Sequence, residues 1–330
     1  MARDAKTIQN IIKNVVQEIS PSRDYRALIF VVRTTPSFAP FINTTVVKLA
    51  SQIIGFTNYN NPGYFRYYQL IGYANGAISY NMGSDDSVEF LNAINSLPIS
   101  DITVSNCSDS LYRALLAAIT SKSVLIYPKS PIYTFGDNLP NDPTYLSKIY
   151  QHVEGEYQGG PIFNIITGLT KNACNFDNDD PENRQLRNFA HFTHGFISFL
   201  PQDTVVDTAF NFYYGTEESK LLATADFIDH CLIGKELTRF IFDNSTNQVT
   251  VFATGNSLNL QVFDSTGKQV TQNFNQKSGN TQMLQFMQFV EGSYSVQAIS
   301  ADNSSPCQIR VYGDDAYKSV STGNAVTYFY

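Results

Sequence analysis

The first two thirds of the chain alternate strand patterns with helical patterns. Residues 5–19 repeat apolar side chains at the spacing of an amphipathic helix: Ile8, Ile11, Ile12, Val15, Val16 and Ile19. The nearly continuous apolar run at 25–32 is typical of a strand buried in a parallel sheet. Further strands are predicted near 65–74, 77–81, 123–127, 161–168 and 196–200. Helices are predicted near 39–54, 85–97, 109–119, 142–153, 181–194 and 203–213. This alternation predicts an α/β fold with a doubly wound, mostly parallel sheet.

The pattern changes near residue 220. From Phe240 to Val311, apolar and polar positions mostly alternate with period two, and turn residues separate the runs. Short strands at this spacing predict a second, all-β sandwich domain. The predicted division is an N-terminal amphipathic helix at 1–24, an α/β domain at 25–220, a linker at 221–235, an Ig-like sandwich at 236–314, and a C-terminal tail or extra strand at 315–330. The apolar end of that tail can complete the sandwich or pair with the sheet edge of a neighbouring molecule.

Composition narrows the function. The 330 residues include 22 Lys and Arg against 29 Asp and Glu, a net charge of −7, without a basic block that would indicate a nucleic-acid partner. No apolar run approaches the ~18 residues that predict a membrane span. Charged residues are only 15% and aromatic residues 13%, which favours an extracellular protein that contacts other proteins over a cytosolic enzyme. The N-terminus lacks the apolar core of a secretory signal, so secretion requires that the numbered chain be a mature or interior piece.

Motifs for enzymatic chemistry are absent from the sequence. It contains no G-x-S-x-G, H-E-x-x-H, P-loop or G-x-G-x-x-G, so we expect no catalytic residues and no cofactor. His191 and His194 stand three apart on a predicted helix, but no third zinc ligand can be named. The acidic run 177–180 favours a solvated loop over a calcium site. Candidate glycosylation sites are Asn43, Asn106, Asn244 and Asn303.

Several segments resemble a known family. Residues 29–38, Ile-Phe-Val-Val-Arg-Thr-Thr-Pro-Ser-Phe, resemble the opening of a von Willebrand factor type A domain, where a strand runs into Asp-x-Ser/Thr-x-Ser and holds a divalent cation. Segments 107–119, 123–130 and 162–200 are similar to the hemicentin-type branch in order and spacing. The resemblance covers roughly 25–215 and implies ligand binding at the carboxyl ends of the strands. The later β region resembles the sandwich that can follow such a domain.

The metal motif of that family is degenerate in this chain. Arg33 and Pro128 stand where the resemblance implies two carboxylates, and only the hydroxyls of Thr35 and Ser37 remain. Two hydroxyls do not hold Mg²⁺ or Ca²⁺ without carboxylate charge, and a guanidinium repels a divalent ion. We therefore predict that no cation binds here. Two explanations stay open: neutral drift, or a fixed positive charge on Arg33 that pairs with an acid of the same chain or of a partner.

The resemblance also gives the four cysteines candidate partners. It places Cys107 and Cys174 on one face of the α/β domain, which makes a Cys107–Cys174 disulfide plausible. Cys231 lies just before the predicted sandwich and Cys307 on its last strand, so these two can form a second disulfide. The alternative is four buried thiols, since no C-x-x-C motif is present. On the same face we name four candidate contact residues: Arg33, Phe38, Lys129 and Tyr133.

Together these observations predict a non-enzymatic, extracellular module of adhesion or matrix type. Its expected partners are proteins, including copies of itself, through contacts that need no cation, and a homo-oligomer, filament or polymer is one form that such contacts can take. One alternative is an extracellular recognition protein, in innate immunity or glycan binding, in which these domains are a scaffold. A cryptic enzyme is the third hypothesis.

Overall fold

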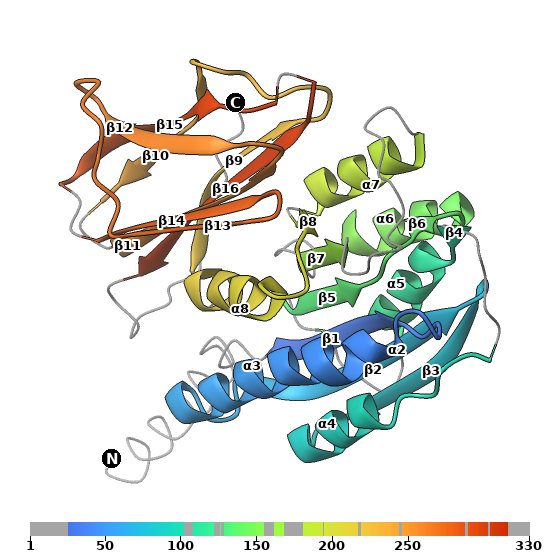
Figure 1. The fold of residues 1–330 in the computed structure, drawn as a ribbon. Coiled ribbons are helices and arrows are strands. Elements are labelled where there is room, and N and C mark those ends of the chain that lie inside the picture. The colour runs from blue at the N-terminus through green and yellow to red at the C-terminus, as the bar shows by residue number, and fades with distance from the viewer. Residues whose placement is uncertain are drawn as a thin grey trace, which may run out of the picture.

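The computed structural model describes residues 26–101, 108–121, 126, 129–154, 162–167, 181–193, 195–216, 219–243, 246–287, 290–302 and 304–315. They form an α/β unit and a β-sandwich unit that lie side by side (Figure 1). Helix α8 (Val205–Thr216) lies between the two units and packs on both.

The α/β unit is built on a six-stranded sheet with the strand order β3-β2-β1-β5-β7-β8. Its strands are β1 (Arg26–Arg33), β2 (Phe65–Ala74), β3 (Ala77–Ser84), β5 (Pro131–Phe135), β7 (Ile162–Thr167) and β8 (Phe196–Phe199). Neighbours run parallel except for the antiparallel pair β2 and β3. Every residue of β1 is buried, as expected for a central strand with helices on both faces.

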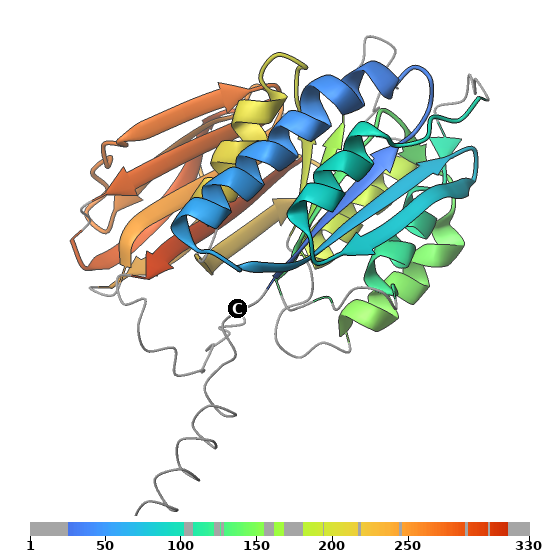
Figure 2. The same cartoon turned by 90° about the horizontal axis from the view of Figure 1, so that it is seen from below.

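Helices cover the two faces of this sheet. One face carries α8 with α2 (Ala39–Phe41), a π-helical turn (Ile42–Val46), α3 (Val47–Asn60) and α4 (Ser87–Asn95), as Figure 2 shows. The other face carries α5 (Leu111–Ile119), α6 (Leu146–Glu154) after a 3-10 turn (Pro143–Tyr145), and α7 (Pro181–Phe192). Successive residues of β1 point to opposite faces, so Phe30 packs in the first core and Ile29 in the second.

The turn of the predicted β2–β3 hairpin is confirmed. Asn75 and Gly76 have φ angles of 55° and 77°, the two left-handed residues that a type I′ turn requires. An Asn-Gly pair tolerates this conformation better than other residues do. The turn lies at the end of the sheet where β1 finishes, because Arg33 is paired with Tyr73.

The sandwich unit consists of two antiparallel sheets. The five-stranded sheet has the order β13-β14-β11-β16-β9 and the three-stranded sheet the order β10-β15-β12. Their bounds are β9 (Lys220–Phe227), β10 (Glu236–Phe242), β11 (Thr246–Gly255), β12 (Asn259–Asp264), β13 (Phe274–Ser278), β14 (Thr281–Met287), β15 (Gly292–Ser300) and β16 (Cys307–Asp315). Inward residues such as Val251, Val262 and Val296 form one core between the sheets.

The predicted fold class, a doubly wound and mostly parallel sheet with a second sandwich domain, is wrong for the chain as a whole. The six-stranded sheet is mixed, both sheets of the sandwich unit are antiparallel, and antiparallel pairs outnumber parallel pairs among the described strands. The reason is geometric. Antiparallel strands can be joined by tight turns, whereas parallel strands need a crossover of a dozen or more residues. The chain after residue 219 therefore holds many strands in few residues.

Two predicted boundaries also need correction. Residues 221–235, predicted to be a linker, begin with β9, which pairs with β16 inside the five-stranded sheet. The strand beside β1 is β5 at Pro131–Phe135, not 123–127; of that range only Ile126 is described, and it lies in no strand. The predicted helix at 1–24 and the tail beyond Asp315 lie outside the described residues.

Candidate functional site

The carboxyl end of the six-stranded sheet holds a buried cluster of charges around Arg33. Arg33 is the last residue of β1, and its guanidinium lies between two carboxylates. Nη1 donates to Asp137 Oδ1 at 2.5 Å and Nε to Asp109 Oδ2 at 3.3 Å. All three side chains are almost fully buried. One fixed positive charge therefore offsets part of the negative charge of the two acids at this end of the sheet.

Asp137 reaches Arg33 because β5 runs beside β1. Val32 is paired with Phe135, so the residues that follow each strand meet at the same edge. Gly136 makes the intervening turn, where an added Cβ would lie 2.8 Å from the Tyr73 hydroxyl. That hydroxyl donates to Asn138 Oδ1 at 3.0 Å. The strand, the glycine and the Asn138 side chain together fix the position of the carboxylate.

Asp109 connects Arg33 to the β2–β3 turn. It ends the short strand β4 (Ser108–Asp109), which pairs in parallel with β6 (Leu139–Pro140). Its Oδ1 accepts the backbone N–H of Gly76 at 3.0 Å and of Ser110 at 2.8 Å, and its Oδ2 accepts that of Asn75 at 3.3 Å. The left-handed turn aims its N–H groups at this carboxylate. Asp109 thus accepts hydrogen bonds from three backbone N–H groups in addition to that from Arg33.

The buried charges around Arg33 and Tyr73 determine the protonation states of these two side chains. Burial alone would lower the pKa of Arg33, but Tyr73, Asp137 and Asp109 raise it above its ordinary value. Burial raises the pKa of Tyr73 well above its usual range, although the charge of Arg33 opposes that shift. The guanidinium is therefore charged and the phenol neutral over the physiological pH range.

The two hydroxyls of the degenerate motif lie beside this cluster. Thr35 Oγ1 is 3.1 Å from Ser37 Oγ, with Thr35 buried and Ser37 exposed. Within the described part of the chain, no group of three or more His, Cys, Asp or Glu side chains could hold a metal ion. Pro128, the other predicted member of the motif, is outside the described residues. The strand that it was expected to follow is replaced by β5, which Asp137 follows.

The predicted contact surface is wrong. Phe38 is fully buried, Tyr133 is 1% exposed and Arg33 4% exposed, so none of them can meet a partner. Phe38 and Tyr133 pack in the core under α3. Lys129 is exposed, but it precedes β5 and lies at the opposite end of the sheet from Arg33. The error comes from predicting a strand at 123–127 that ends at this edge of the sheet, whereas the strand beside β1 is β5, and Lys129 precedes it.

The sequence analysis did not associate Asp109 with Arg33, and it did not name Asp137. The available signal was Gly136-Asp137-Asn138 directly after the short apolar run 131–135. A Gly-Asp-Asn turn after a buried strand places a carboxylate at the carboxyl edge of the sheet.

The other candidate residues are distributed over the molecule. Cys231 and Cys307 form a disulfide with a Cα–Cα distance of 5.3 Å, which joins the segment before β10 to the start of β16. Asn43 is exposed on the π-helical turn. Outside the described residues lie Cys107, Cys174, Asn106, Asn244, Asn303, His194 and the acidic run 177–180.

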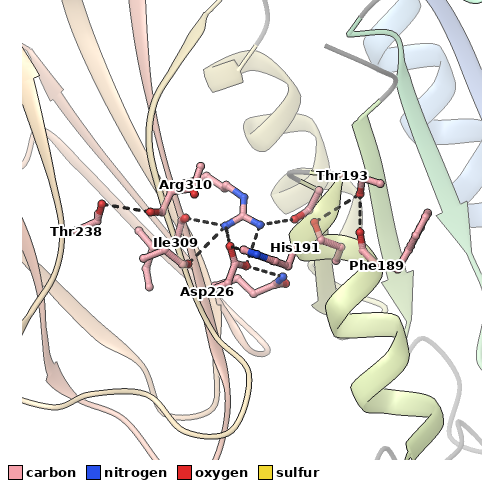
Figure 3. A network of polar contacts seen from close by, with 12 residues as sticks. Phe189, His191, Thr193, Asp226, Thr238, Ile309 and Arg310 are labelled. Carbon is pink, nitrogen blue, oxygen red and sulfur yellow. Dashed lines mark hydrogen bonds and ion pairs between the residues drawn. The ribbon is translucent and has the colours of Figure 1, made fainter. Parts of the chain in front are cut away.

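A second buried ionic cluster joins the two units (Figure 3). The fully buried Arg310 on β16 pairs with Asp226 on β9, and its Nη2 also donates to the Gly195 carbonyl at 3.2 Å. His191 on α7 contacts the same Asp226 through Nδ1 at 2.8 Å. Burial alone would raise the pKa of Asp226, but the charge and hydrogen bonds of Arg310, with those of His191, lower it overall.

Side chains of the sandwich also cap the outer edge of β8. The Ile197 N–H donates to Gln308 Oε1 at 3.2 Å, and the Phe199 N–H donates to Asn280 Oδ1 at 2.7 Å. The Asn280 N–H in turn donates to the Phe199 carbonyl at 3.2 Å. A separate hydrophobic cluster fills the contact between the two units, which we call the joint: Phe196, Phe212, Phe252, Met283 and Tyr312. An unpaired strand edge is a site of unwanted pairing, so the sandwich protects the sheet.

Comparison with known proteins gives one family match. Residues 244–310 match the family described as a secretion system C-terminal sorting domain, which points to a secreted or cell-surface protein. The matched range includes three residues of the joint described above, Asn280, Gln308 and Arg310. No helix of the described residues is long and apolar enough to cross a membrane.

The similar proteins are distant. Protein irg-7 of Caenorhabditis elegans is 23% identical over 312 residues, which cover 92% of this chain but only 14% of the nematode protein. The pilus adhesin SpaC of Lactobacillus rhamnosus GG is 10% identical with a TM-score of 0.38, covering 87% of this chain and 39% of SpaC. The type V pili tip protein Mfa5 of Porphyromonas gingivalis is 9% identical with a TM-score of 0.32, covering 88% and 62%. Scores this low carry no argument about function.

Proposed function

We propose that this chain is a non-enzymatic, extracellular module of adhesion or matrix type, which contacts other proteins without a divalent cation. The observation that carries the proposal is the burial of Arg33 between Asp109 and Asp137. A divalent ion at the carboxyl end of the sheet would need these two carboxylates as ligands. Both already pair with one guanidinium that cannot lose its proton in a protein, and that fixed positive charge opposes a divalent ion at the same place. Binding to a partner therefore proceeds through the protein surface alone.

Two further observations support the extracellular location. A disulfide such as Cys231–Cys307 persists in oxidising compartments and is rare in the cytosol. The match of residues 244–310 to a secretion sorting family agrees with that location. The low share of charged residues and the many tyrosines and phenylalanines suit contacts between proteins.

The proposal can be tested with beads that carry the full chain. We expect beads coated with the chain to cluster with each other, and the clustering to be the same in EDTA as in Ca²⁺ and Mg²⁺. Beads coated with serum albumin are the matched control. Clustering that EDTA abolishes contradicts the cation-independent contact. Absence of clustering together with saturable binding to a glycan array contradicts the adhesion role and favours the recognition scaffold.

A further inference from the structure

Four aromatic side chains form a partly exposed surface where α3 lies beside α8. We call this set the α3–α8 patch; its members are Phe56 and Tyr59 on α3 with Phe210 and Tyr214 on α8. The ring of Phe56 lies 5.7 Å from that of Phe210 and 5.3 Å from that of Tyr214. Tyr59 is three residues beyond Phe56, so the two share a helix face. Tyr59 is 87% and Tyr214 48% exposed. Figure 2 shows the two helices side by side.

A row of buried rings connects this patch with the start of β1. Phe56 contacts Tyr213 at 6.5 Å between ring centroids, Tyr213 contacts Phe65 at 6.1 Å, and Phe65 contacts Tyr64 at 5.1 Å. The Arg26 guanidinium lies 5.9 Å from the Tyr64 ring, and the Arg26 N–H donates to the Tyr64 carbonyl. Arg26 is the first residue that the structure describes. Residues 1–25 therefore join the molecule at one end of an aromatic row whose other end is exposed.

The sequence of residues 1–25 contains an apolar pattern that would suit the aromatic patch. Six β-branched residues recur at helical spacing between Ile8 and Ile19. An amphipathic helix is stable in water only when its apolar stripe is buried, because propensity alone does not hold so short a helix. Six residues separate Ile19 from Arg26, a span of up to ~20 Å when extended. The aromatic row from Tyr64 to Phe56 consists of three ring contacts with centroid distances of 5.1, 6.1 and 6.5 Å. The linking residues are therefore long enough to reach from Arg26 to the patch.

We propose that residues 5–19 form a helix that docks its apolar stripe on the α3–α8 patch of the same chain. The patch is aromatic and the stripe is β-branched aliphatic, so the rings offer apolar faces to the stripe while the hydroxyls of Tyr59 and Tyr214 need water or another polar partner. The occupant is a segment of the same chain because it is tethered beside the patch, so its local concentration exceeds that of a second copy at ordinary protein concentration. This inference does not depend on the proposed function.

Hydrogen exchange of the full chain, read by mass spectrometry, tests the docking. We expect peptides covering 5–19 to exchange at least about tenfold more slowly than an unstructured chain. Tyr214→Asp places a charge in the patch and should remove that protection, as should Ile12→Asp within the stripe. Val88→Asp, at a 60% exposed position on α4, is the matched control and should leave it unchanged.

Three results would overturn the docking. The first is exchange of 5–19 at the unstructured rate in the unmodified chain. The second is protection that survives both Tyr214→Asp and Ile12→Asp. The third is protection that rises with protein concentration, which assigns the patch to the helix of a second copy. Exchange of β1 and β16 in each variant shows that the fold is intact, because both strands lie in the cores.

Discussion

The guanidinium of Arg310 donates one hydrogen bond to each carboxylate oxygen of Asp226, from Nη1 to Oδ2 at 2.7 Å and from Nη2 to Oδ1 at 2.9 Å. Both residues belong to the five-stranded sheet, yet the same Nη2 also donates to Gly195 of the α/β unit. The guanidinium lies 5.3 Å from the centre of the Phe196 ring as well. A buried ion pair of the sandwich unit thus donates a hydrogen bond to a backbone carbonyl of the α/β unit and links the two units.

Replacing Arg310 should destabilise the whole chain. Arg310→Leu removes the buried counter-ion of Asp226, which keeps its contacts with His191 and Gln308, and it removes a donor to the Gly195 carbonyl. We expect a loss of about 3–5 kcal/mol in the free energy of unfolding. Urea denaturation followed by circular dichroism measures it. The matched control is Arg239→Leu, whose exposed pair with Glu236 should contribute nothing measurable. An equal loss of unfolding free energy in Arg310→Leu and Arg239→Leu would show that Arg310 does not stabilise the contact between the two units.

Asp226 should make the joint sensitive to acid. Its pKa is lowered in the folded chain, so the stabilisation is complete above its unfolded pKa of about 3.9 and is lost as the pH falls through the lower folded value. We expect the urea midpoint to be steady from pH 7 to about 5 and to fall below about pH 4. Asp226→Asn should start lower and fall less steeply. Parallel profiles for the variant and the unmodified chain would contradict the assignment to Asp226.

Gly279 should be indispensable at the joint. It has a φ of +53°, and an added Cβ would lie on the Phe199 carbonyl oxygen, which the strand edge uses to bind Asn280. Gly279→Ala should cost clearly more than the about 1–2 kcal/mol expected for left-handed strain alone. Gly267→Ala is the matched control, since Gly267 has a φ of +81° with open space around it. Thermal unfolding compares the two, and equal losses would argue against the close contact.

Arg33 should be needed for stability rather than for contact with a partner. Arg33→Met leaves Asp109 and Asp137 buried without a counter-ion, and we expect a loss of about 3–5 kcal/mol. Arg66→Met, an exposed arginine on the neighbouring strand β2, should change little. Urea denaturation measures both. A stable Arg33→Met chain would mean that the acids are neutralised in another way.

The sequence predicts local structure well where one element determines it. The Asn75-Gly76 turn and the helix around Phe90 follow from turn chemistry and from the capping Asp86, which accepts the Val88 N–H. The central strand was misplaced because two five-residue apolar runs, 123–127 and 131–135, are equivalent by periodicity. Only pairing with β1 distinguishes them, and that pairing is a tertiary effect.

The contacts between the units could not be predicted for a different reason. Gln308 and Asn280 are uncharged polar residues on or beside strands, a common composition on a solvent-facing side of a sheet. Their partners, the N–H groups of Ile197 and Phe199, are more than 80 positions away in sequence. Likewise, the acids around Arg33 come from separate crossovers, so no local pattern associates them with β1.

Calorimetric titration of the unmodified chain with Ca²⁺, Mg²⁺ and Mn²⁺ tests whether the guanidinium of Arg33 takes the place of an ion at the end of β1. We expect no saturable heat with any of the three ions, and the same unfolding temperature in EDTA as in Ca²⁺. Micromolar binding of one ion that disappears in Ser37→Ala would contradict it, since the ion would then occupy the end of β1 in spite of Arg33.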